Sequence, residues 1–147
     1  MKLKVSPLKL WQLCEFMNTA RPLDLLECYH ASNEAFRDTL VNEFNNTYCL
    51  YDADAQEVYA IWGVDKEEIE SVIWMLCTDK VEEKPITFLR YCKKYIEGLL
   101  DQHPLMHNYV WLGNYLHVKW LKWMGARFGE IITRNGEPFQ YFYFMKE

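Results

Sequence analysis

The sequence predicts an α/β domain with a mixed central sheet of about six or seven strands, about four flanking helices and a C-terminal β-hairpin. Three observations support this fold class. Segments with helical and strand periodicity alternate along the 147 residues. Gly113 and Gly125 separate a strand, a helix and another strand, and Asn135-Gly136 is a strong hairpin signal. No linker or repeat interrupts the pattern, so we expect residues 1–147 to form a single domain.

The N-terminal third is predicted to hold a short strand and two or three helices. Lys2–Val5 is the strand, and Ser6-Pro7 supplies an N-cap and a first helical residue. The helix that follows places four apolar residues on one face, namely Leu10, Leu13, Cys14 and Met17. Helical spacing resumes after Arg21-Pro22 and ends at Asn45-Asn46, as one kinked helix or two short ones with Ser32 as the second N-cap.

The middle of the chain is predicted to be a three-stranded antiparallel meander followed by a helix. The strands are Tyr48–Tyr51, Val58–Trp62 and Val72–Leu76, which are rich in β-branched and aromatic residues. Pro85 starts the helix, which ends near Asp101. Its apolar stripe consists of Phe88, Leu89, Cys92, Ile96 and Leu99.

The C-terminal third is predicted to be strand, helix and hairpin. Asn108–Leu112 is too short for a helix before Gly113 interrupts the run. Asn114 is then an N-cap whose side-chain oxygen can accept a backbone N–H, and Gly125 can end the helix in the left-handed conformation. The buried helical face is His117, Trp120, Leu121 and Met124, and the hairpin strands are Phe128–Thr133 and Phe139–Met145.

Composition excludes several classes of function. The chain has 16 basic and 21 acidic residues and a formal charge of -5, which argues against nucleic acid as a partner. Five cysteines without a CxxC spacing favour buried thiols in a reducing compartment. Neither a signal peptide nor a membrane span is predicted. Pro104 separates His103 from His107, so no metal site is predicted.

The last helix resembles that of the GNAT (acyl-CoA N-acyltransferase) family. Asn114, His117, Trp120-Leu121 and Gly125 fall in the family's register, and the order of elements is also that of the family. Thr78-Asp79 and the stretch from Asn108 to Asn114 resemble small GNAT-like proteins of tailed bacteriophages, including an internal virion protein of short-tailed enteric phages.

The resemblance implies acetyl-CoA as the cofactor, but the loop that would hold its pyrophosphate departs from the family pattern. Active members have a Gly-rich turn there, whereas residues 79–86 contain no glycine. Pro85 removes an N–H donor, and Glu82 and Glu83 add negative charge. Tight binding is therefore not expected. If CoA binds, its contacts would be Cys77, Thr78, Lys80, Lys84, Ile86, Thr87 and Asn114.

The catalytic groups implied by the resemblance are also incomplete. The family's general acid is a Tyr seven residues after the Asn, a position held here by Leu121. Candidate bases are Glu70 and Asp79 at the ends of a central strand, with His117 as a third. The structural alternatives are solvated strand ends for the two carboxylates and a hydrogen-bonded core position for the histidine.

Two functions follow from these observations. The first is a GNAT-like phage protein without ordinary acetyltransferase chemistry, which binds a virion component or a host protein in virion morphogenesis or host takeover. It would act in the host bacterial cytoplasm or the virion, and an inhibitor of a host defence system would look the same in sequence. The alternative is an active acetyl-CoA-dependent N-acyltransferase with a variant loop. Trp123 is a candidate for the edge of a partner interface.

Overall fold

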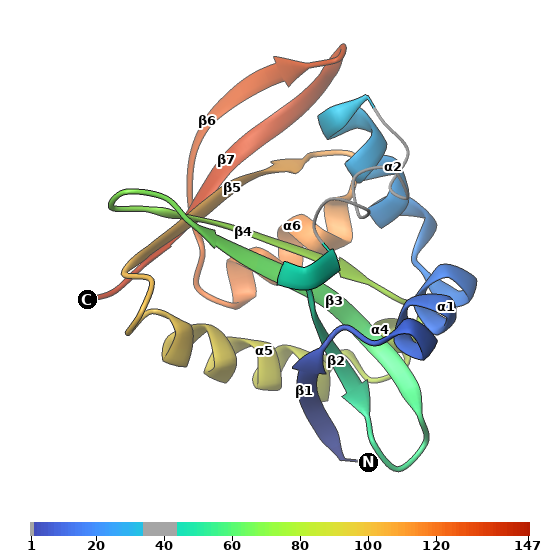
Figure 1. The fold of residues 1–147 in the computed structure, drawn as a ribbon. Helices are drawn as coiled ribbons and strands as arrows, with labels where there is room; N and C mark the ends of the chain where they lie inside the picture. Colours follow the sequence, from blue (N-terminus) through green and yellow to red (C-terminus); the bar gives the residue numbers. More distant parts are fainter. Residues whose placement is uncertain (1, 34–43) are drawn as a thin grey trace. The chain divides into compact units, whose positions relative to one another are not determined.

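The structure, a computed structural model, describes residues 2–33 and 44–147 (Figure 1). Its elements in chain order are β1 (Leu3–Pro7), α1 (Leu10–Thr19), α2 (Pro22–Ser32), a 3-10 turn (Phe44–Asn46), β2 (Tyr48–Asp52), β3 (Glu57–Lys66), β4 (Ser71–Cys77), α4 (Lys80–Glu83), α5 (Pro85–Leu99), β5 (Leu105–Trp111), α6 (Tyr115–Trp123), β6 (Arg127–Arg134) and β7 (Glu137–Met145). These seven strands and five α-helices of the described residues confirm the predicted fold class.

The strands have the hydrogen-bonded order β1-β2-β3-β4-β5-β7-β6. β4 is parallel to β5, whereas β1–β2, β2–β3, β5–β7 and β6–β7 are antiparallel pairs, so the sheet is mixed as predicted. The chain divides into two compact units. The first unit is Met1–Gly63 with Trp74–Lys84, and the second unit is Val64–Ile73 with Pro85–Glu147. β3 and β4 contribute residues to both units.

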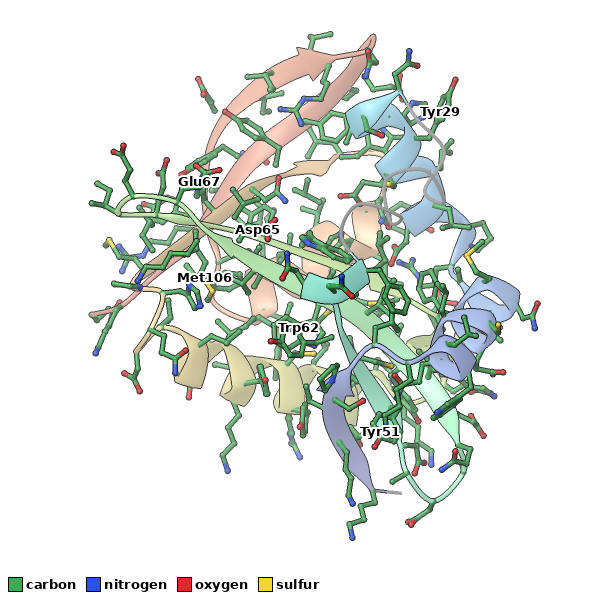
Figure 2. The ribbon with its side chains drawn as sticks, in the orientation of Figure 1. Tyr29, Tyr51, Trp62, Asp65, Glu67 and Met106 are labelled. Carbon is green, nitrogen blue, oxygen red and sulfur yellow. The ribbon has the colours of Figure 1, made fainter. Side chains whose placement is uncertain are left out.

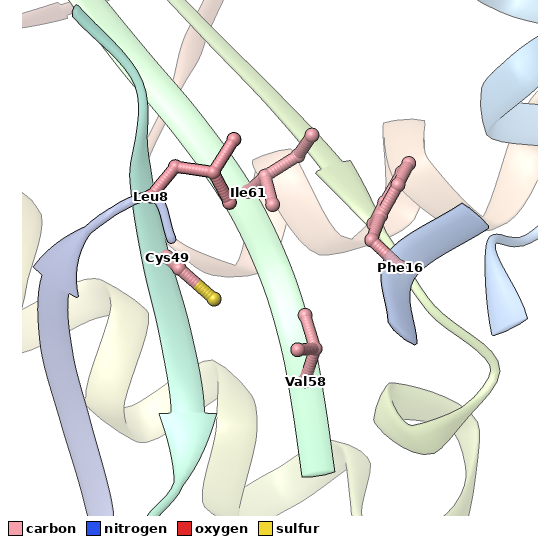
Figure 3. Close-up of a cluster of buried hydrophobic side chains, with 5 residues drawn as sticks. All are labelled: Leu8, Phe16, Cys49, Val58 and Ile61. Atoms are coloured by element: carbon pink, nitrogen blue, oxygen red, sulfur yellow. The ribbon is translucent and has the colours of Figure 1, made fainter. Parts of the chain in front are cut away.

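The core of the first unit lies among β2, β3, α1 and the turn before α1. It is a cluster of buried apolar side chains, namely Leu8, Phe16, Cys49, Val58 and Ile61 (Figure 3). Tyr51 and Trp74 pack against it and are half-buried. One phenyl ring and branched aliphatic side chains therefore make up most of this buried cluster.

The first helix differs from its prediction. Ser6 and Pro7 belong to β1, and the helix begins at Leu10. Gln12 is buried because its side chain closes the turn before the helix: Oε1 accepts the Lys9 N–H (2.8 Å) and Nε2 donates to the Ser6 hydroxyl (3.1 Å). That arrangement turns the helix so that Phe16 faces the core.

The predicted apolar face of α1 consequently points away from the core. Leu10 is 71% exposed and Met17 is 44% exposed, and Cys14 is exposed as well. Only Leu13 packs against the core cluster. The buried-thiol prediction is therefore wrong for Cys14, whereas Cys49, Cys77 and Cys92 are buried.

Several elements after α1 are longer or shorter than predicted. α2 ends at Ser32, and Asn33 adopts the left-handed conformation (φ 58°) as its C-cap. The continuation predicted through Phe36 and Leu40 lies outside the described residues. β3 runs on through Lys66, and a four-residue helix, α4, occupies a segment predicted to be a loop.

The second unit packs α5 and α6 with one face of β5 and β7. Phe88 of α5 and Trp120 of α6 meet edge to face, with ring centroids 5.9 Å apart. Met106 and Val110 of β5 are fully buried (Met106 is labelled in Figure 2), as expected from strand alternation. Phe142 and Phe144 of β7 lie in register opposite Asn108 and Met106.

Gly125 and Gly136, two glycines of the second unit, act as predicted. Gly125 has φ 101° and ends α6 in a Schellman motif, in which Gly125 N–H donates to Lys122 O (3.1 Å) and Ala126 N–H to Leu121 O (3.0 Å). Asn135 and Gly136 both have positive φ, as a two-residue hairpin requires. Asn114 holds the N-cap position, but its side chain makes no capping hydrogen bond, so that part of the prediction is wrong.

No helix among the described residues is long and apolar enough to cross a membrane.

Candidate functional site

The GNAT resemblance places the pyrophosphate at residues 79–86, and the segment from Cys77 to Glu82, at the end of β4 and in α4, covers the start of this loop. Six consecutive backbone N–H groups in this segment of the first unit already donate within the chain. Their acceptors, in order from Cys77, are Asp24 Oδ2 (2.6 Å), Tyr59 O (2.9 Å), Thr19 O (2.9 Å), Thr78 Oγ1 (3.3 Å), Thr78 O (3.4 Å) and Asp79 O (3.1 Å). An anion at a helix N-terminus needs such groups to point at it. Here they point at protein oxygens.

A buried ion pair holds the end of β4 in the position where its N–H groups are engaged. Arg21 and Asp24 are 4% and 2% exposed, and Arg21 Nη1 lies 2.6 Å from Asp24 Oδ1. The other Asp24 oxygen accepts the Cys77 N–H, while the Arg21 N–H donates to Cys77 O (2.9 Å). Arg21 Nε also contacts Glu82 Oε1 at 3.2 Å. A single pair of charges thus ties α2 to β4 and α4.

Sequence reasoning missed this pair. An arginine and an aspartate three residues apart at the start of a helix are usually a solvated surface pair. Burial is decided by β4 and α4, which are distant in sequence, so the sequence has no signal that would identify it.

Thr78 faces inward. Its hydroxyl donates to Val58 O at 2.7 Å, and the residue is fully buried. Together with the N–H of Thr78, this bond fastens the start of the candidate loop to β3.

The lysine expected to meet a phosphate is paired with carboxylates. Lys80 Nζ lies 3.1 Å from Glu57 Oε2 and 3.4 Å from Glu83 Oε2. Hydrogen bonds to Glu57 and then to Glu83 raise the pKa of Lys80 above its ordinary value. Lys80 therefore stays protonated, but its charge is already balanced. Lys84 is exposed.

The remaining candidate cofactor residues lie in the second unit. Pro85 begins α5, and Ile86 and Thr87 in its first turn are exposed. Asn114 is fully buried at the start of α6. Its N–H donates to Trp111 O (3.0 Å), and its carbonyl accepts the Val118 N–H (3.2 Å).

The position of the family's general acid is structural here. Leu121 is buried on α6 beside Trp120, and His117 on the same helix is half-buried. Tyr115, the tyrosine at the start of α6, is 73% exposed. The tyrosines Tyr59, Tyr91, Tyr109 and Tyr141 have pKa values raised mainly by burial, which makes them weaker acids than an ordinary tyrosine.

The candidate bases occupy two different places. Asp79 is exposed at the start of α4 in the first unit. Glu70 precedes β4 in the second unit, and its Oε2 lies 3.6 Å from His107 Nε2.

His103 is paired separately, with Nδ1 2.8 Å from the Ser71 hydroxyl. Among residues 2–33 and 44–147 no group of three or more His, Cys, Asp and Glu side chains forms a metal-binding cluster.

Solved structures similar to this chain are GNAT acetyltransferases. A GNAT-family acetyltransferase from Bacillus anthracis matches with a TM-score of 0.75 and 8% identity over 99% of this chain and 95% of that chain. Spermidine N-acetyltransferase from Vibrio cholerae, solved with CoA and spermine, matches with a TM-score of 0.68 and 11% identity over 98% of this chain and 95% of that chain. At such identities the likeness shows the GNAT fold alone.

A sequence relative of this chain comes from a bacteriophage. Probable scaffold protein gp13 of Escherichia phage T7 is 35% identical over 81 residues, which are 55% of this chain and 52% of that protein. The chain therefore matches about half the length of this relative. The family described as Bacteriophage T7, probable scaffold protein Gp13, matches residues 52–133, which include the end of β4, α4 and α6. The chain belongs to this family.

Proposed function

We propose that this chain is a GNAT-like phage protein without ordinary acetyltransferase chemistry, which acts by binding another protein during virion morphogenesis. The observation that supports this most is the set of occupied N–H groups from Cys77 to Glu82. A CoA pyrophosphate would have to displace protein acceptors from these donors, and each displaced buried group costs about 1–3 kcal/mol.

Charge also opposes CoA binding. Lys80 is already balanced by Glu57 and Glu83. Glu82 is held near the segment by Arg21. An added pyrophosphate would meet these carboxylates, because Lys80 in α4 is already paired and the exposed Lys84 follows the helix. Leu121 further leaves the family's position on α6 without an acid for the departing thiolate.

Binding to a protein is supported by the exposed apolar residues of α1. Leu10, Cys14 and Met17 are spaced at i, i+4 and i+7 and are all exposed, so they form one stripe along the helix. Trp11 beside them is 38% exposed. Clustered apolar side chains on a surface mark interaction sites more often than isolated ones do.

Calorimetric titration with acetyl-CoA, together with a thiol-release assay on a panel of amines, tests the absence of chemistry. We expect neither saturable heat nor released CoA. Micromolar binding accompanied by acetylation of any amine would overturn the proposal in favour of an N-acyltransferase with a variant loop. The CoA complex of the structurally similar spermidine N-acetyltransferase makes that the natural alternative.

Purified phage particles test the binding role. We expect the chain to sediment with virions or assembly intermediates of the phage that encodes it. Recovery only with a host protein from infected cells would instead assign the chain to host takeover and contradict a role in morphogenesis.

A further inference from the structure

β6 is the terminal strand of the sheet in the second unit. Its inner side pairs with β7 from Arg127↔Tyr143 to Arg134↔Glu137, and the order of strands ends with it (Figure 1). Ile131 is 60% exposed, although it lies in the middle of the strand. An exposed edge of this kind presents unpaired backbone groups to another strand.

The hairpin geometry tells which backbone groups face outward. Asn135-Gly136 is a two-residue turn, so Arg134 and Glu137 form its closing, hydrogen-bonded pair. Pairs alternate in an antiparallel ladder, and therefore Ile132 also bonds to β7. Ile131 and Thr133 are left with N–H and C=O groups that point away from the sheet. Pro138, which has no N–H, lies opposite Thr133, as this alternation requires.

Two opposite charges share one face of this strand. Glu130 Oε1 lies 3.1 Å from the Tyr109 hydroxyl, and the Arg134 guanidinium lies over the Tyr109 ring at 5.2 Å. Their Cα atoms are four residues apart, roughly 13 Å along a strand, and each side chain contacts Tyr109. Ile132 lies between them on the same face.

We propose that β6 pairs antiparallel with β6 of a second copy of this chain, in a two-fold symmetric register centred on Ile132. Ile131 then exchanges backbone hydrogen bonds with the partner's Thr133. Glu130 lies opposite the partner's Arg134, and the reverse pair forms by symmetry. In this register Ile132 meets its own copy at a non-hydrogen-bonded position, and the two charge pairs flank it as opposite charges across the strands.

Two other antiparallel registers also pair outward-facing residues of the two copies, but they place the charged side chains less favourably. Centring on Ile131 places Glu130 opposite Ile132 and brings Arg134 to the bulge between Phe128 and Ile131. Centring on Thr133 places Arg134 opposite Ile132. Charged side chains and bulges usually protect an edge from strand addition. In this strand residues 131–134 pair regularly with β7, and Glu130 is the last residue of the bulge. The spacing of Glu130 and Arg134 favours one register with a second copy.

Charge reversal tests the register by sedimentation velocity over a concentration series. The wild-type chain should form a dimer, and either Glu130→Arg or Arg134→Glu should weaken it about tenfold by placing like charges opposite each other. The double variant should restore dimerisation. A monomeric wild type, or a double variant no better than the single ones, would refute the proposal. Thermal unfolding of each variant checks that the contacts with Tyr109 are not essential for folding.

Cysteine cross-linking tests the same register without changing a charge. In a Cys14→Ser background, Ile132→Cys places two cysteines directly opposite each other, with Cα atoms about 4.5 Å apart. Oxidation should then yield a disulfide-linked dimer. Thr133→Cys is the matched control, because its Cα atoms would be roughly 8–9 Å apart, beyond disulfide reach. Equal cross-linking of both, or of neither, would contradict the register. The result is independent of whether CoA binds.

Discussion

The Asp24 carboxylate accepts the Cys77 backbone N–H at 2.6 Å, and with its other oxygen it pairs with Arg21. This relationship removes a donor from the end of β4 and holds α4 against it. The start of the segment that resembles a cofactor loop is therefore tied into the fold by its own hydrogen bonds.

Removing Asp24 should be strongly destabilising. Asp24→Ala leaves the Arg21 guanidinium buried without its closest partner, which typically costs about 3–5 kcal/mol of the free energy of unfolding. Chemical denaturation measures this. Glu82→Gln is the control, because Glu82 is half-exposed and its contact with Arg21 should contribute at most about 1 kcal/mol. Equal losses of the free energy of unfolding in the two variants would show that the Arg21–Asp24 pair is not the main interaction that holds α2 to β4 and α4.

Restoring a tyrosine on α6 should not restore acetyl transfer. Leu121→Tyr returns the family's general acid to its register, but the N–H donors from Cys77 to Glu82 stay engaged. We expect no acetyl-CoA turnover above background and a loss of about 1–3 kcal/mol in stability, because Leu121 is buried and a larger side chain must displace its neighbours. Turnover by this variant would show that the loop accepts CoA.

The exposed stripe of α1 should matter for binding and not for folding. Leu10→Lys with Met17→Lys should change the free energy of unfolding by less than about 0.5 kcal/mol per site, because both residues lie on the exposed face of α1. The same variant should be lost from phage particles. Phe16→Ala on the buried face is the contrasting variant and should cost about 3–5 kcal/mol. Normal incorporation of the double-lysine variant would place the binding surface elsewhere.

Stability should fall as the solution becomes alkaline. Burial raises the pKa of Cys49 and of Cys92 to about 12 from the ordinary 9.0. Above pH 9 the unfolded chain releases these protons while the folded chain retains them, so each thiol lowers the free energy of unfolding by up to about 1.4 kcal/mol per pH unit. Denaturation at pH 8, 9 and 10 measures the slope. Cys92→Ala should flatten it, whereas Cys14→Ser, at an exposed thiol, should not.

The two units should unfold together. β3 and β4 each contribute residues to both units, so neither unit retains complete strands when the other unfolds. We expect a single calorimetric transition with equal calorimetric and van't Hoff enthalpies. Two resolved transitions would contradict the predicted single domain.

The sequence by itself determined the elements whose cause is local. Gly125 ends α6 and Asn135-Gly136 closes the hairpin because only such residues readily adopt positive φ. Pro85 begins α5, and its stripe buries Phe88, Leu89 and Cys92. The sequence alone also showed that Leu121 replaces the family's tyrosine and that the segment after β4 has no glycine. Each of these depends only on the residue type at given positions.

Tertiary structure alone decided which faces are buried and which donors are occupied. Periodicity assigned Leu10, Cys14 and Met17 to the core, yet the bonds of Gln12 with Ser6 and Lys9 turn α1 the other way. The short helix α4 and the burial of Arg21 with Asp24 depend on contacts between segments more than 50 residues apart in sequence, such as the bond from Cys77 to Asp24. A hydrogen bond between distant segments leaves no periodic trace in the sequence, and so only the folded chain shows that the candidate loop is closed.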